Sequence, residues 1–104
     1  MNISDRIKEQ VTKTPVVLYM KGDPSFPQCG FSARAVQVLQ LCGVEKFDTY
    51  NILEDPELRQ GIKVYSNWPT IPQLYVNGEF VGGSDIMIEM YESGELHELL
   101  KTVA

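Results

Sequence analysis

The chain has 104 residues, a length that suits one compact domain, and we expect that domain to span residues 1–104. Hydrophobic residues make up 43% of the chain and charged residues 22%, as in an ordinary globular protein, and no apolar run approaches the roughly 20 residues of a membrane span. The formal net charge of −5 argues against nucleic-acid binding, because phosphate backbones are bound by a clustered positive field. We therefore expect no membrane partner and no nucleic-acid partner.

The first part of the chain alternates between helix and strand signals. Apolar residues at helical spacing predict a helix over 4–13, with Ser4 as its N-cap. The run 15–20 is rich in β-branched and aromatic residues and predicts a buried strand, whereas 21–28 contains two prolines and a glycine and predicts a loop. A second set of apolar residues at helical spacing predicts a helix over 30–41.

The middle of the chain adds a strand, a helix and a hairpin. The segment 46–53 alternates in the manner of a strand, and 54–66 predicts a helix capped by Asp55 with a proline at the first helical position. The clearest local signal lies in 72–83, where two short strands flank Asn77-Gly78, a pair that favours a type I′ hairpin turn.

The end of the chain predicts two further helical pieces. Ser84 can cap a helix that Gly94 interrupts, and 95–103 supplies the last helical segment. The parallel strands of an early βαβ unit need a helical crossover, and the later hairpin adds antiparallel strands. We therefore expect an α/β fold with a four-stranded mixed sheet flanked by helices on both faces.

Cys29 lies where the proline-containing loop meets the second helix. The free N–H groups and the positive dipole end of a helix N-terminus stabilise a thiolate, and Lys21 at the end of the preceding strand can add a positive charge. The alternative is that Cys29 is a small buried hydrophobic residue, as many free cysteines are. Its position favours a reactive or metal-binding thiol.

The sequence disfavours a redox pair of cysteines. Cys42 lies 13 residues beyond Cys29 along the same helix. That separation is about 20 Å at 1.5 Å per residue, whereas a disulfide requires Cα atoms within about 7 Å. Ser32 stands where a C-x-x-C motif has its second cysteine, and a hydroxyl cannot form a disulfide. We expect Cys42 to be a structural residue.

Four short motifs carry a resemblance to a known family. They are KG at 21–22, CGFS at 29–32, WPTIP at 68–72 and GGSD at 82–85, and together they span most of the chain. In this order and spacing they resemble the monothiol glutaredoxins of the thioredoxin superfamily, especially the single-domain forms of alphaproteobacteria and mitochondria. The resemblance implies the thioredoxin fold.

The resemblance also implies a role for each motif. Cys29 would ligate a [2Fe–2S] cluster or react with glutathione, and the other motifs would line a groove for glutathione. The glutathione-binding residues implied in this way are Lys21, Arg59, Lys63, Thr70, Ile71, Pro72, Ser84 and Asp85. The cations would meet the glycine carboxylate, the backbone ahead of a cis-proline would pair with the tripeptide, and the start of the next helix would hold the γ-glutamyl end.

Each of these assignments has a structural alternative. The three cationic residues could be solvated surface charges, Trp68 could belong to the core, and Gly82-Gly83 could simply end the hairpin. We expect His97 and the glutamates of the last two helical pieces to lie on a solvated surface. Many members of the family have GGCD where this chain has Ser84, so a mechanism that uses a cysteine at that position is excluded here.

The ligand count points to a function. An all-thiolate [2Fe–2S] cluster needs four sulfur ligands, and one chain offers one suitable thiolate. With glutathione as the further ligand that the resemblance implies, two chains and two glutathione molecules complete the set, so we expect a homodimer when the cluster is bound. The leading hypothesis is a glutathione-dependent [2Fe–2S] cluster carrier in iron–sulfur cluster assembly and transfer. The alternative is a thiol-disulfide oxidoreductase that removes glutathione from mixed disulfides through Cys29.

The resemblance implies three further kinds of partner, namely iron–sulfur assembly proteins, recipient apo-proteins and BolA-like proteins. Residues 1–15 lack the features of a secretory signal and contain acidic residues that transit peptides avoid. We therefore expect a cytoplasmic protein in a bacterium, or a protein of the mitochondrial matrix if a presequence has been removed. Beside the carrier function we expect at most a weak oxidoreductase activity.

Overall fold

Four strands form a mixed sheet in the computed structural model, which describes residues 2–103. The strands lie in the order β4-β1-β5-β6 and span Val16–Met20 (β1), Asp48–Asn51 (β4), Gln73–Val76 (β5) and Glu79–Gly82 (β6). β1 pairs parallel with β4 and antiparallel with β5, and β6 pairs antiparallel with β5. In this register Leu18 lies between Thr49 of β4 and Leu74 of β5, so β1 is an interior strand of the sheet.

β1 is interior because its side chains are apolar on both faces. All five of its residues are buried, as the continuous apolar run predicts for a strand covered on both sides. Leu18 and Met20 pack into one hydrophobic cluster, whereas Val17 and Tyr19 pack into the other. The alternation of side chains along a strand therefore supplies both cores from one segment.

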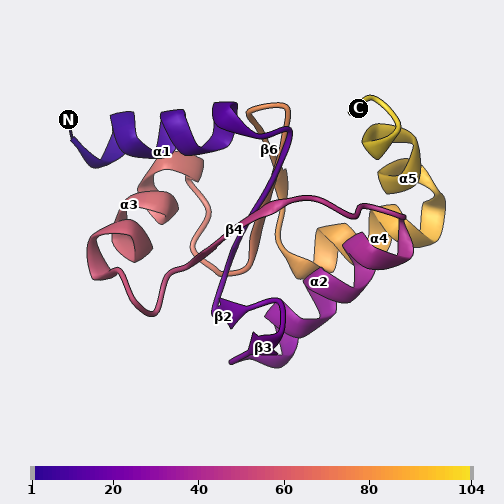
Figure 1. Cartoon of the computed structure of the whole chain (residues 1–104), viewed down its shortest axis with the longest axis horizontal. Coiled ribbons are helices and arrows are strands. Elements are labelled where there is room, and N and C mark those ends of the chain that lie inside the picture. The colour runs from indigo at the N-terminus through magenta and orange to yellow at the C-terminus, as the bar shows by residue number, and fades with distance from the viewer. Residues whose placement is uncertain (1, 104) are drawn as a thin grey trace.

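Two layers of helices enclose the sheet (Figure 1). The helices are α1 (Ile3–Lys13), α2 (Gly30–Leu41), α3 (Pro56–Ser66), α4 (Ser84–Ser93) and α5 (Glu95–Leu100). α1 and α3 cover one face and pack against Tyr19 and Tyr75, and α2, α4 and α5 cover the other. The predicted α/β fold, with a four-stranded mixed sheet between helices, is confirmed.

Two of the predicted local signals act as expected. The Asp55 carboxylate caps α3 by accepting the Leu58 N–H at 3.1 Å, and a proline follows it at the start of the helix. Asn77 and Gly78 have φ angles of 53° and 81°, the left-handed values that a type I′ turn needs at both central positions. These signals define the start of α3 and the turn between β5 and β6.

The structure corrects three local predictions. α1 begins one residue before Ser4, because the Asn2 side chain accepts the Asp5 N–H at 2.9 Å and serves as the cap. The N-cap of α4 is Gly83, and Ser84 is already helical. The predicted loop 21–28 contains two paired two-residue strands, β2 (Gly22–Asp23) and β3 (Phe26–Pro27).

The β2–β3 hairpin forms because Asp23 closes the turn. Its carboxylate accepts the N–H groups of Ser25 and Phe26, at 3.0 and 2.9 Å. Gly22 has a φ of 88°, and a Cβ there would lie 2.5 Å from the Phe26 carbonyl oxygen, so the close approach of the two strands needs glycine.

Within residues 2–103, no helix has both the length and the apolar character needed to cross a bilayer.

Candidate functional site

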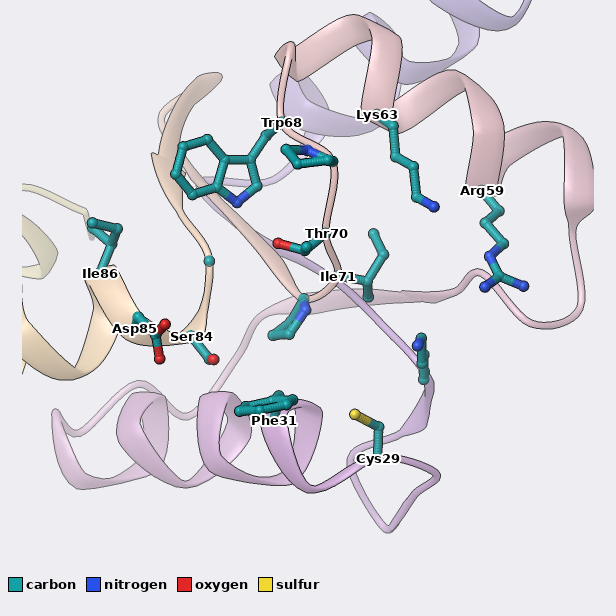
Figure 2. Close-up of a pocket in the computed structure, with 14 residues that line it drawn as sticks. Cys29, Phe31, Arg59, Lys63, Trp68, Thr70, Ile71, Ser84, Asp85 and Ile86 are labelled. Atoms are coloured by element: carbon teal, nitrogen blue, oxygen red, sulfur yellow. The ribbon is translucent and has the colours of Figure 1, made fainter.

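A groove of about 380 Å³ lies where five segments of the chain meet (Figure 2). Its walls come from the end of β1, the start of α2, the exposed side of α3, the loop before β5 and the start of α4. Every site residue expected from the sequence lines it, namely Lys21, Cys29, Arg59, Lys63, Thr70, Ile71, Pro72, Ser84 and Asp85. Segments that are far apart in the sequence therefore meet at one surface depression.

Cys29 is the N-cap of α2, as predicted, and its thiol is partly exposed in the groove. The sulfur forms no cap hydrogen bond with any described residue, yet the nearby backbone N–H groups stabilise its charge. The N–H of Ser32 is the main cause that lowers the pKa of the Cys29 thiol, and the Phe31 N–H and the Lys21 ammonium act in the same direction. Burial opposes this shift, but the net effect favours the thiolate.

The other two residues relevant to thiol chemistry are placed so that Cys29 acts alone. Ser32, in the position of a second motif cysteine, is fully buried, and its hydroxyl accepts the Lys21 N–H at 3.0 Å. Cys42 is the C-cap of α2, at the opposite end of the helix from Cys29, and both cysteines are free. Burial raises the pKa of the Cys42 thiol. Cys42 also packs against the hydrophobic core, which agrees with its predicted structural role.

The charged residues of the groove stand on two opposite sides. Arg59 and Lys63 project from α3 one helical turn apart, and Asp85 lies across the groove at the start of α4 (Figure 2). Neither these residues nor Lys21 forms an ion pair with another described residue. Their charges are therefore free to meet a ligand.

The loop before β5 forms the wall between these two sides. The peptide bond between Ile71 and Pro72 is cis, and both residues are buried, whereas Thr70 is exposed to the groove. The amide of the buried Gln73 donates to the carbonyl oxygens of Trp68 and Thr70, at 3.0 and 3.2 Å. Gln73 thus fixes the loop from below, a role that no sequence motif indicated.

The start of α4 approaches this loop closely at Gly83. A Cβ on Gly83 would lie 3.2 Å from both the Pro72 carbonyl oxygen and the Trp68 indole nitrogen. The Trp68 ring packs on Phe80, with 5.7 Å between ring centroids, and also lines the groove. Trp68 is therefore half-buried: it lines the groove and packs on Phe80, which lies at the edge of the core.

Several uncharged residues that line the groove were given no individual role from the sequence, and Ile86 lies outside the four motifs. The residues are Phe31, Pro69, Gly83 and Ile86. Phe31 fits the apolar spacing of α2, yet 63% of its surface is exposed beside Cys29. Its place directly inside the thiol motif was the available signal. His97 and the glutamates of α4 and α5 are exposed, as predicted.

The groove holds one thiol and no preformed metal site of the usual kind. Among residues 2–103, no group of three or more His, Cys, Asp and Glu side chains could hold a metal ion. A thiolate stabilised by a helix N-terminus, flanked by cations and an anion, suits thiol chemistry with a charged ligand.

Comparison with known proteins identifies the family. The glutaredoxin family model matches residues 16–81, a stretch that contains Cys29 and all the segments that line the groove except the start of α4. The chain belongs to the glutaredoxin family. An uncharacterized monothiol glutaredoxin, ycf64-like, from Synechocystis is 60% identical and covers 92% of this chain and 89% of its own. Mitochondrial monothiol glutaredoxin-5 of Schizosaccharomyces pombe is 57% identical, and the match covers 93% of this chain and 68% of that protein. Glutaredoxin 4 of Escherichia coli is 53% identical, and the match covers 96% of this chain and 86% of that protein.

Solved structures of other glutaredoxins share the fold. Reduced apo GrxS14 of poplar superposes with a TM-score of 0.84 at 51% identity, covering 96% of this chain and 91% of its own. The holo form of glutaredoxin C1 from Populus tremula x tremuloides gives a TM-score of 0.86 at 25% identity, covering 98% of each chain. This glutaredoxin therefore has the thioredoxin fold and is of the monothiol type.

Proposed function

We propose that this monothiol glutaredoxin carries a [2Fe–2S] cluster together with glutathione and delivers it to recipient apo-proteins. The observation that supports the proposal is the isolation of one activated thiol. Cys29 is at the groove, Cys42 is at the far end of α2, and the buried Ser32 offers a hydroxyl instead of a second thiol. An all-thiolate cluster needs four sulfur ligands, so two chains and two glutathione molecules supply them.

The charge layout of the groove supports glutathione as the additional thiol. Arg59, Lys63 and Lys21 are cations suited to the glycine carboxylate of glutathione. On the opposite side, Asp85 suits the ammonium group of the γ-glutamyl end, and the first N–H groups of α4 suit its carboxylate. The volume of about 380 Å³ falls within the usual range for small-molecule sites.

The partners of such a carrier follow from its cargo. We propose iron–sulfur assembly proteins as donors, apo-proteins as recipients, and BolA-like proteins as further partners. The similar proteins include a mitochondrial glutaredoxin of yeast and a bacterial glutaredoxin. The mitochondrial matrix and the bacterial cytoplasm both fit the proposal.

Anaerobic reconstitution with iron, sulfide and glutathione tests the proposal. The expected product is a brown dimer with one [2Fe–2S] cluster per two chains, and omission of glutathione should lower the yield sharply because half of the thiolate positions are then empty. Cys29→Ser should abolish cluster binding, and Cys42→Ser is the matched control that should retain it. Visible spectra, iron analysis and size-exclusion chromatography measure the outcome. A stable cluster in Cys29→Ser contradicts the proposal, as does its loss in a folded Cys42→Ser.

The lowered pKa of Cys29 favours one alternative function, the reduction of glutathione mixed disulfides. The Cys29 thiolate would attack the glutathione sulfur, the disulfide bond would break, and the substrate would leave as a thiolate. A second glutathione thiolate would then attack the Cys29-bound glutathione, release glutathione disulfide and restore the Cys29 thiolate. Colourless protein that turns over a glutathionylated substrate rapidly would favour this alternative.

A further inference from the structure

The Lys21 backbone lies just beyond the paired part of β1. β4 ends at Asn51 opposite Met20, and β5 begins at Gln73 opposite Tyr19, so neither neighbouring strand continues alongside Lys21. A backbone N–H at such a place has lost its sheet partner and needs another acceptor when it is shielded from water.

A side chain of the active-site helix supplies that acceptor. The Ser32 hydroxyl accepts the Lys21 N–H at 3.0 Å, and Ser32 is fully buried. The Lys21 carbonyl oxygen accepts the Gln28 N–H at 2.9 Å, immediately before the cysteine. The next N–H, that of Gly22, donates to the Asn51 side chain at 2.9 Å. Three different segments therefore hold the backbone that carries the Lys21 side chain.

The Ser32 contact differs from the other two because of where Ser32 stands. It belongs to the first turn of α2, the turn whose N-cap is Cys29, and Lys21 and Cys29 both line the groove. The hydrogen bond thus joins the helix that presents the thiol directly to the strand end that presents the cation. An alanine at this position would break that link without removing a group from the groove, because Ser32 itself does not line it.

We propose that Ser32 is a positioning residue, whose buried hydroxyl holds Lys21 in place for glutathione at a defined distance from Cys29. The serine of the CGFS motif then contributes a hydrogen bond of its own, besides leaving the motif without a second cysteine. A thiol is a weak hydrogen-bond acceptor, so a cysteine at position 32 would hold the Lys21 backbone less well. The inference rests on the proposed binding of glutathione in this groove.

A double-mutant cycle on glutathione affinity tests the role. Ser32→Ala in the otherwise unchanged protein should weaken glutathione binding about fivefold, the effect of losing one hydrogen bond that orders a charged contact. In a Lys21→Ala background the same substitution should change the affinity less than about twofold, because the group that it positions is already gone. Ser93→Ala, which removes an exposed hydroxyl outside the groove, is the control and should bind like the wild type. Calorimetric titration and thermal melts provide the data.

Amide hydrogen exchange tests the contact itself in the unmutated protein. The Lys21 amide should exchange slowly in the wild type, and in Ser32→Ala it should exchange at least about tenfold faster while the amides within β1 keep their rates. A wild-type Lys21 amide that exchanges as fast as a free one overturns the inference even if Ser32→Ala fails to fold. Equal weakening by Ser32→Ala with and without Lys21 also overturns it, since the serine would then act only on general stability.

The failures of the two proposals can be told apart. Wild-type protein that binds no glutathione contradicts the proposed function, and with it the role of Ser32. Wild-type protein that binds glutathione while a folded Ser32→Ala binds it equally well contradicts the role of Ser32 alone.

Discussion

Cys29 and Cys42 cap the two ends of the same helix, and the pKa values of their thiols are shifted in opposite directions. At the N-terminal end, backbone N–H groups and Lys21 lower the pKa of Cys29. At the C-terminal end, burial alone raises the pKa of Cys42. The two ends of the helix therefore favour different protonation states, a thiolate at Cys29 and a neutral thiol at Cys42.

Alkylation should reveal this difference directly. Near neutral pH, iodoacetamide should modify Cys29 well before Cys42, because the thiolate is the nucleophile and Cys29 has the larger thiolate fraction. The half-maximal rate for Cys29 should also occur at a lower pH than that for Cys42. Mass mapping after brief alkylation measures both rates. Equal labelling, or faster labelling of Cys42, contradicts the assignment.

Removal of a groove charge should weaken glutathione binding and leave the fold intact. Lys21→Ala and Asp85→Ala should each lower the affinity about tenfold, the usual effect of losing one hydrogen bond to a charged group. Lys101→Ala is the control, because Lys101 is an exposed lysine outside the groove. Calorimetric titration and thermal melts give affinity and stability. Unchanged affinity in both groove variants would identify Lys21 and Asp85 as solvated surface charges.

Gly22 should be intolerant of substitution. Gly22→Ala should lower the free energy of unfolding by about 2 kcal/mol or more, because its φ is positive and a Cβ would clash with the Phe26 carbonyl oxygen. Gly30→Ala is the matched control, since a Cβ on Gly30 meets no atom within 4 Å. Chemical denaturation compares the two. A Gly22→Ala protein as stable as Gly30→Ala would show that the β2–β3 hairpin tolerates another backbone path.

The contact between Arg6 and Asp55 should make the free energy of unfolding depend on pH. The hydrogen bond from Arg6 is the main cause that lowers the pKa of Asp55. A carboxyl with a lowered pKa stabilises the fold fully above its ordinary pKa near 4 and loses that contribution as the pH falls through the lowered value. Asp55→Asn keeps an N-cap but loses the ion pair, whereas Asp55→Ala loses both.

The expected differences are small because the two side chains are 38% and 32% exposed. Asp55→Asn should cost about 0.5 kcal/mol at pH 7, and Asp55→Ala about 1 kcal/mol more. Denaturation between pH 3 and pH 7 should show the Asp55→Asn difference shrink as the pH falls below about 4. A difference that persists unchanged at pH 3 would mean that the ion pair with Arg6 is not its source.

The elements that the sequence predicted are those with strong local signals. The apolar run of β1, the Asp55 cap and the Asn77-Gly78 turn each act within a few residues, and each appears in the structure. The β2–β3 hairpin was missed because its two prolines and Gly22 resemble an irregular loop. Asp23 was the overlooked signal, since its carboxylate can close a turn through neighbouring N–H groups.

The candidate site divides in a similar way. The presence of Cys29 and the charged residues at one groove could be predicted, Cys29 from its place before the second helix and the charged residues from the family resemblance. The hydrogen bonds of Gln73 and Ser32 could not be predicted, because they reach segments that only the folded chain brings near. Phe31 fits the apolar spacing of α2, yet its side chain is exposed in the first turn of the helix.

The separation of positive and negative charge makes the two sides of the groove electrostatically different. Arg59 and Lys63 lie on one side, and Asp85 lies on the other (Figure 2). A peptide with an ammonium group at one end and a carboxylate at the other is attracted in one orientation and repelled in the reverse orientation. Two peptides of the same composition and net charge can differ only in which end carries the ammonium group and which end carries the carboxylate. The groove can therefore distinguish between them.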